Sequence, residues 1–62
     1  MEKLKNNLHV LFGTEVWSYT TKVAIIHDDH IEELGHWSKT TTGHVNYVGK
    51  LYGKEVKRYE TN

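Results

Sequence analysis

The stretch that decides the fold covers residues 37–52 and reads WSKTTTGHVNYVGKLY. Its three consecutive threonines suit a helix N-cap, where a side-chain oxygen accepts hydrogen bonds from free backbone N–H groups. The pattern predicts the end of a strand, a Thr-rich cap and an amphipathic helix, which Gly53 can end as a left-handed C-cap residue. After the threonines, apolar residues recur at steps of three and four, the period of one helix face: Val45, Val48, Tyr52, Val56 and Tyr59. If Gly53 ends the helix, residues 54–59 are expected to form a second helical turn or a loose strand.

Two segments upstream predict strands joined by a hairpin. Residues 15–26 are rich in β-branched and aromatic side chains that alternate between two faces, which is typical of one long, half-buried strand. Residues 27–29, His-Asp-Asp, have the composition of a turn, and residues 30–34 then return as a short strand. We expect residues 36–39 to continue from this strand toward the threonines.

The first residues leave two alternatives open. The run Leu-His-Val-Leu-Phe at residues 8–12 is compact and apolar and stops at Gly13, which favours a strand followed by a turn. A short N-terminal helix competes with this strand over residues 1–12, because four apolar residues fall at helical spacing: Met1, Leu4, Leu8 and Leu11.

Together these segments predict the α+β class, with a small antiparallel β-meander of three to four strands packed by one C-terminal helix. At 62 residues the chain makes one domain, residues 1–62, near the lower size limit for folding alone. It has no Cys, so no disulfide or thiolate metal site adds stability. Because a short meander leaves strand edges unpaired, and residues 8–12 carry little charge, we expect a homodimer.

The charged residues are segregated along a chain whose formal net charge is zero. Residues 1–35 carry three Lys against six Asp and Glu, a net charge of −3, whereas residues 36–62 carry five Lys and Arg against two Glu, a net charge of +3. A zero net charge argues against a general nucleic-acid binder, because attraction to phosphates needs an excess of cations. No run resembles a membrane span, and residues 1–12 lack the apolar core of a signal peptide, so we expect a cytoplasmic protein.

Five histidines raise the question of a metal site. His27, His30 and the two aspartates between them offer nitrogen and oxygen ligands, with His36 as a further contributor. However, a spacing of i, i+3 in a turn is not a recognised ligand spacing, and Asp-Asp is common in turns. We therefore predict a solvated acidic turn and no metal site.

The threonine-rich stretch raises the question of catalysis. His44 could act as a general base for Ser38 or a threonine hydroxyl, but no third group that would orient it is recognisable. A protonated His is also unfavourable at a helix N-terminus. We predict no catalytic residue and no cofactor, since the stretch lacks the Gly-rich loop and Lys of a phosphate site. The stretch instead predicts a structural corner in which His44 stays neutral: Trp37, Ser38, Thr41, Thr42 and His44.

Two motifs, SYTTKVA at residues 18–24 and WSKTTTGHVNYV at residues 37–48, are separated by a short hairpin. Together they resemble a group of small phage and mobile-element proteins, in which an S-Y-x-T-x-V-A strand and a brief turn precede a W/Y-S-x-T-T-x-x-H-x-N segment that opens a helix. The chain departs from that pattern in its HDDH turn and in Gly43, where the group often has a larger residue. The resemblance implies a phage-type origin, a β-meander with one helix, and action on a host protein.

Two functional hypotheses follow, and an enzyme is not expected because no residue pattern forms a catalytic signature. The favoured one is a small non-enzymatic phage-type binding protein that occupies a surface of a host protein in the host cytoplasm, for host takeover or as an anti-defence inhibitor. Its acidic edge would steer it toward a basic partner surface: Asp28, Asp29, Glu32 and Glu33. The alternative is a nucleic-acid accessory protein that uses a basic C-terminal helix: Lys50, Lys54, Lys57 and Arg58.

Overall fold

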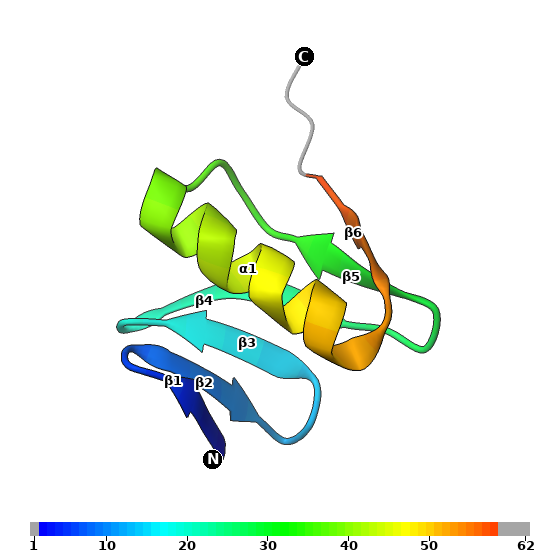
Figure 1. Cartoon of the computed structure of the whole chain (residues 1–62), viewed down its shortest axis with the longest axis horizontal. Coiled ribbons are helices and arrows are strands. Elements are labelled where there is room, and N and C mark those ends of the chain that lie inside the picture. The colour runs from blue at the N-terminus through cyan, green and yellow to red at the C-terminus, as the bar shows by residue number, and fades with distance from the viewer. Residues whose placement is uncertain (1, 59–62) are drawn as a thin grey trace.

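The computed structural model describes residues 2–58, including the side chains of residue 4 and residues 6–58. Over this range the chain forms a six-stranded sheet with one helix on one face (Figure 1). The elements are β1 (Glu2–Lys5), β2 (Leu8–Leu11), β3 (Glu15–Ser18), β4 (Thr21–Ile26), β5 (His30–Glu33), α1 (Lys39–Tyr52) and β6 (Glu55–Lys57). β1 to β5 pair in chain order as an antiparallel meander, and β6 lies parallel to β5 after α1 has crossed the sheet. The α+β class, with a meander packed by one C-terminal helix, is confirmed, and the described meander has five strands where three or four were expected.

The segment 15–26, expected as one strand, is a β-hairpin. β3 and β4 pair with Ser18 opposite Thr21, so that Tyr19 and Thr20 alone form the loop, and Tyr19 takes a left-handed φ of 58°. A continuous strand over this segment would span about 40 Å at roughly 3.3 Å per residue, more than the longest dimension of the molecule, 33 Å. The prediction of one strand is wrong because Tyr and Thr are strand-favouring residue types that here form the turn.

The first residues form strands, which decides between the two alternatives at the N-terminus. β1 and β2 pair with each other, and no described residue before β3 is helical. Phe12 and Gly13, at left-handed φ values of 57° and 70°, turn the chain into β3, and the N–H of Thr14 donates to the carbonyl of Leu11 at 3.1 Å. β2 lies between β1 and β3, so residues 8–12 are not the open sheet edge from which we expected a homodimer.

The two ends of α1 are set by Ser38 and Gly53. Ser38, rather than a threonine, is the N-cap: its Oγ accepts from the N–H of Thr41 at 3.3 Å, in line with the strong preference for Ser at this position. Residues 36–38, expected to prolong β5, form an irregular connection instead, because β5 ends at Glu33. At the other end Gly53 caps the helix with a left-handed φ of 65°, as predicted.

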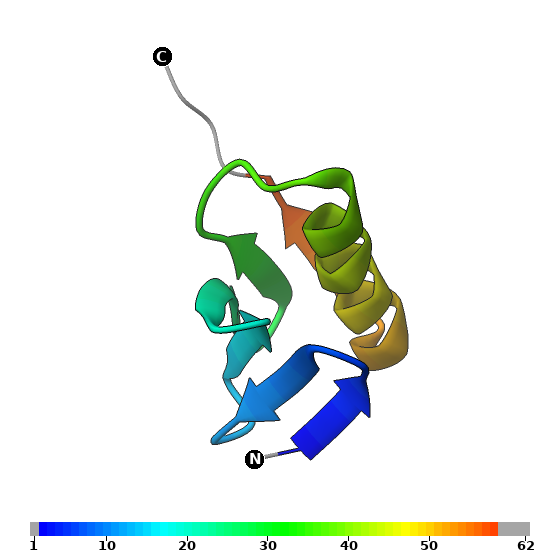
Figure 2. The same cartoon turned by 90° about the vertical axis from the view of Figure 1, so that its left-hand side faces the viewer.

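A core of aliphatic side chains joins α1 to the sheet, and each of its members is at most 6% exposed: Leu8, Val10, Val16, Val23, Ala24, Ile26, Ile31, Val45 and Val48. α1 comes close to β6 at Gly49, where an added Cβ would lie 2.6 Å from Cγ2 of Val56. No described helix or strand covers the opposite face of the sheet, which we call the outer face (Figure 2).

α1 is also short. Its 14 residues fall below the roughly 20 apolar residues that cross a bilayer. In the part of the chain that the structure describes, no helix is long and apolar enough to span a membrane.

Candidate functional site

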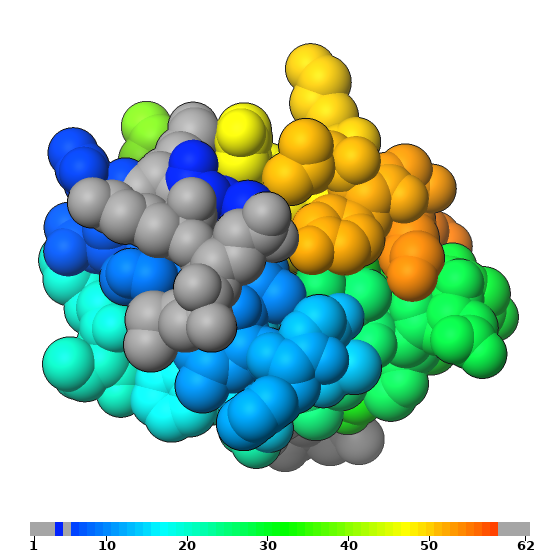
Figure 3. All heavy atoms as spheres, turned by 90° about the horizontal axis from the view of Figure 1, so that it is seen from below, coloured from blue at the N-terminus to red at the C-terminus, as the bar shows by residue number. Residues whose placement is uncertain are grey.

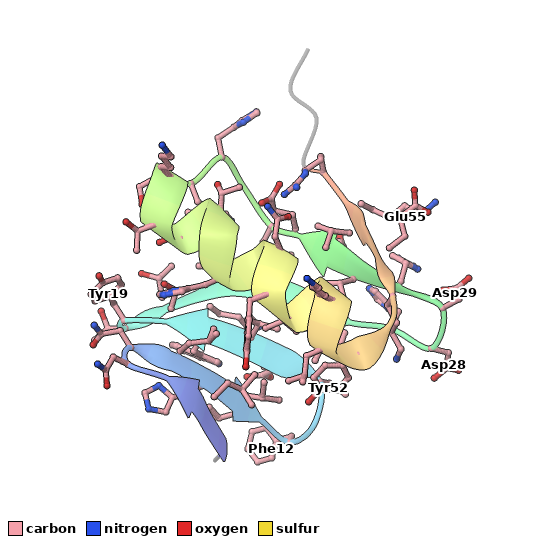
Figure 4. All side chains as sticks on the ribbon, viewed as in Figure 1. Phe12, Tyr19, Asp28, Asp29, Tyr52 and Glu55 are labelled. Atoms are coloured by element: carbon pink, nitrogen blue, oxygen red, sulfur yellow. The ribbon has the colours of Figure 1, made fainter. Side chains whose placement is uncertain are left out.

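The acidic residues predicted to recognise a partner begin at the tip of the β4–β5 hairpin. Asp28 and Asp29 lie exposed there and point away from the sheet (Figure 4). The N–H of His27 closes the hairpin by donating to the carbonyl of His30 at 2.8 Å. The Asp29 side chain is 87% exposed, and its Oδ1 lies 2.6 Å from Nδ1 of His30. These two aspartates form the exposed acidic turn expected from the sequence.

Two histidines hold the side chains of this hairpin in place. The rings of His27 and His30 stack with their centroids 4.5 Å apart and an interplanar angle of 20°. Nε2 of His27 lies 2.9 Å from Oε1 of Glu32, so each imidazole contacts one carboxylate. The hydrogen bond from His30, together with the electrostatic attraction of its ring, lowers the pKa of the Asp29 carboxyl below its ordinary value. Asp29 therefore becomes protonated only at a lower pH than an ordinary aspartate does.

The predicted acidic edge is split between the two faces of β5. Glu32 is exposed on the outer face, whereas Glu33 is 7% exposed and lies on the side of α1. Oε2 of Glu33 accepts from Nη1 of Arg58 at 3.3 Å. The assignment of Glu33 to a partner-binding edge is wrong, because successive side chains of a strand point to opposite faces.

Sequence reasoning missed one carboxylate near the hairpin. Glu55 is exposed at the start of β6 and is the register partner of His30 in the parallel β5–β6 pair (Figure 4). No sequence motif indicates that the chain returns to β5 after Gly53, so nothing in the sequence could have placed Glu55 beside the histidines.

The basic residues do not form the helical surface that the alternative hypothesis requires. That prediction is wrong because α1 ends at Tyr52. Only Lys50 lies on the helix among the four basic residues, which are Lys50, Lys54, Lys57 and Arg58. The other three follow the helix: Lys57 lies in β6, which runs beside β5, and Lys54 and Arg58 flank that strand.

Two of these cations are engaged inside the molecule. Nζ of Lys54 donates to the carbonyl of His27 at 2.7 Å. Arg58 donates to Glu33 and, through Nη2, to the side-chain oxygen of Asn46. The segment around β6 thus packs against the β4–β5 hairpin, as the orange and green atoms on one side of Figure 3 show. Cations of the second half of the chain therefore lie beside carboxylates of the first half.

The predicted structural corner forms around the N-terminus of α1. Trp37 is half-buried against the core, and its Nε1 donates to the carbonyl of Val23 at 3.2 Å. Its ring lies over Gly35, where an added Cβ would meet Cζ2 of the indole at 3.1 Å. Oγ1 of Thr42 donates to the carbonyl of Trp37 at 3.4 Å, one turn after the Ser38 cap. Trp37, Ser38 and Thr42 thus fix the entry of the chain into the helix.

His44 bonds across to the β3–β4 hairpin rather than within the corner. Its Nδ1 lies 2.9 Å from Oγ of Ser18, and the same hydroxyl lies 3.2 Å from Oγ1 of Thr41. A Ser–His contact can activate a nucleophile, but Ser18 is 1% exposed, so a substrate atom cannot reach its Oγ. The contact instead links α1 to the β3–β4 hairpin. The sequence-based partners of His44, which were Ser38 or the threonines, are corrected to Ser18.

A shallow depression lies on the outer face, lined by His9, Leu11, Trp17 and Tyr19, with a volume of about 230 Å³. Trp17 is half-buried, and its Nε1 donates to Oε1 of Glu15 at 3.1 Å. The depression is smaller than the pockets that enclose most small ligands, which measure roughly 300–1,000 Å³.

The histidines of the hairpin do not converge on a common point. Among the described residues, no group of three or more His, Asp or Glu side chains is placed to hold a metal ion. His27 and His30 are each directed to a different carboxylate, Glu32 and Asp29.

The chain belongs to the family of unknown function DUF8033, whose model matches residues 2–61. No curated protein and no solved structure gives a significant match. The family match covers nearly the whole chain and adds no activity, substrate or partner.

Proposed function

We propose that this member of the DUF8033 family is a small non-enzymatic binding protein that occupies a surface of another protein. The β4–β5 hairpin carries the proposal, because it projects Asp28 and Asp29 into solvent, with Glu32 exposed beside them on β5. Exposed carboxylates at the tip of a hairpin attract a basic surface and orient it before contact. The partner would therefore present Lys and Arg side chains.

The partner that fits the resemblance to small phage proteins is a host protein in the host cytoplasm, met during host takeover or as a target of an anti-defence inhibitor. Host proteins that handle nucleic acids carry basic surfaces, which an acidic hairpin can occupy in place of phosphates. The nucleic-acid alternative has less support. Lys54 and Arg58 are bound within the molecule, and Nζ of Lys57 lies 3.9 Å from Oε1 of Glu55.

Capture of host proteins from a lysate by the tagged chain tests the proposal. We compare the wild type with the double variant Asp28→Asn, Asp29→Asn, which should keep its fold because exposed carboxylates contribute little to stability. We expect the association rate with the captured partner to fall about tenfold at low salt. The difference should shrink at high salt, where screening already weakens the attraction.

A matched control removes two charges from the other side of the molecule. Lys39 and Lys50 are exposed on α1, and the double variant Lys39→Gln, Lys50→Gln should capture the partner as the wild type does. If capture instead requires these lysines and tolerates loss of the aspartates, the protein binds an anionic partner, and the nucleic-acid hypothesis replaces this one.

A further inference from the structure

The outer face of the sheet is built from two rows of side chains that cross the strands. The first row consists of register partners on β2, β3 and β4: His9, Trp17 and Lys22. The second consists of register partners on β2 to β5: Leu11, Glu15, Ile25 and Glu32. All seven side chains are half-buried or exposed, whereas residues that alternate with them along the strands are in the core. Both rows therefore point away from α1.

Apolar side chains occupy the centre of this face. Trp17, Leu11 and Ile25 are half-buried there, and the first two line the depression described above. No described helix or strand covers them (Figure 2). Covering them would remove apolar surface from water, which is the main favourable contribution to protein association.

The face has the size of a stable interface. The two longer dimensions of the molecule, which lie in the plane of Figure 1, are 33 and 24 Å. Their product is comparable with the area of about 800 Å² per partner that a standard interface buries.

Side chains of opposite charge lie in the two rows, and this arrangement selects the occupant. The first row carries Lys22 together with His9, while the second row carries Glu15 and Glu32 and ends with Lys57 on β6. A two-fold axis that runs across the strands, midway between the rows, would place the first row of one copy over the second row of another. Trp17 of one copy would then lie over Glu15 of the other, between the flanking Leu11 and Ile25. Lys22 would lie over Ile25, between the carboxylates of Glu15 and Glu32. The face is thus complementary to itself, as a two-fold interface requires.

We propose that the protein is a homodimer in which two outer faces pack against each other about this axis. Sheets that pack face to face in this way stand about 10 Å apart with their strands about 30° from alignment. Asp28 and Asp29 lie beyond the second row, so the dimer presents one acidic tip at each end. The inference goes beyond the proposed function and does not depend on it, because it concerns the purified protein alone.

Sedimentation velocity of the purified protein from about 1 µM to about 1 mM tests this proposal. The variants Lys22→Glu and Glu32→Lys each bring like charges together across the interface, and we expect each to weaken self-association about tenfold or more. When the two variants are mixed in equal amounts, opposite charges face each other again. A heterodimer should then form with an affinity near that of the wild type.

The control variant Lys50→Glu makes the same charge change on α1, far from the outer face, and should leave the dimer affinity unchanged. Circular dichroism melts establish that all three variants fold. A wild-type chain that stays monomeric up to about 1 mM overturns the proposal. So does a dimer whose affinity is insensitive to Lys22→Glu, because its interface would then lie elsewhere.

Discussion

Two glycines of α1 have opposite surroundings, and replacing each by alanine separates helix propensity from packing. Gly43 is exposed, and a Cβ placed there meets no atom within 4 Å. Gly49 is buried, and a Cβ there would lie 2.6 Å from Cγ2 of Val56 and 3.1 Å from the carbonyl oxygen of Lys54. Both positions are helical, so alanine adds the same intrinsic helix stabilisation at each, about 1 kcal/mol.

The two substitutions should therefore change stability in opposite directions. Gly43→Ala should raise the free energy of unfolding by about 1 kcal/mol. At Gly49 the same gain is opposed by steric overlap with the Val56 methyl group and with the Lys54 carbonyl oxygen, which belongs to the backbone that joins α1 to β6. Overpacking costs about 1–3 kcal/mol, so Gly49→Ala should lower the free energy of unfolding by up to about 2 kcal/mol.

Urea unfolding followed by circular dichroism measures both free energies, and an unchanged denaturant slope shows that the change lies in stability alone. Thermal melts give a second reading, because 1 kcal/mol corresponds to about 4–8 °C in Tm for a domain of this size. We expect the variants to fall on opposite sides of the wild type. If Gly49→Ala is as stable as Gly43→Ala, β6 does not pack against α1 at this point, and the reasoning is refuted.

Two further predictions concern hydrogen bonds. Ser18→Ala removes the hydroxyl shared by Thr41 and His44 and should lower the free energy of unfolding by about 1–3 kcal/mol; an unchanged urea midpoint would contradict a structural role. His30→Phe keeps a ring beside His27 but removes the hydrogen bond to Asp29, so an NMR titration should show the pKa of the Asp29 carboxyl rising toward its ordinary value. A lowered pKa in the folded state makes the wild type more stable than the variant at pH values above the ordinary pKa of an aspartate. This difference in the free energy of unfolding should disappear as the pH falls through the lowered pKa.

Features that depend on adjacent residues were predictable from the sequence. A glycine placed after a periodic apolar run indicates a helix C-cap, and Gly53 forms one. Two aspartates between strand-like segments indicate a turn, and Asp28 and Asp29 form it. The α+β class follows from the same patterns, because a change from alternating to helical periodicity is itself a local signal.

The β3–β4 turn depends on distant contacts and could not be predicted from residue type. Tyr19 and Thr20 favour strands, yet they form a two-residue loop. The turn is held where Ser18 meets Thr41 and His44, which lie 23 and 26 residues further along the chain. The position of β6 also depends on a contact with another element, because β6 approaches α1 closely at Gly49, which has no side chain.

Charge segregated along the chain does not give a molecule with one acidic face and one basic face. β6 returns parallel to β5, which places Lys57 in register with Glu32 and Arg58 against Glu33. Since electrostatic attraction in physiological salt fades within about 8–10 Å, a partner that approaches β5 meets carboxylates and cations together. Of the four carboxylates first predicted to bind a partner, the two at the hairpin tip alone project beyond the strands. Neutralising these two, rather than all four, therefore tests recognition by charge without disturbing the partly buried Glu33–Arg58 pair.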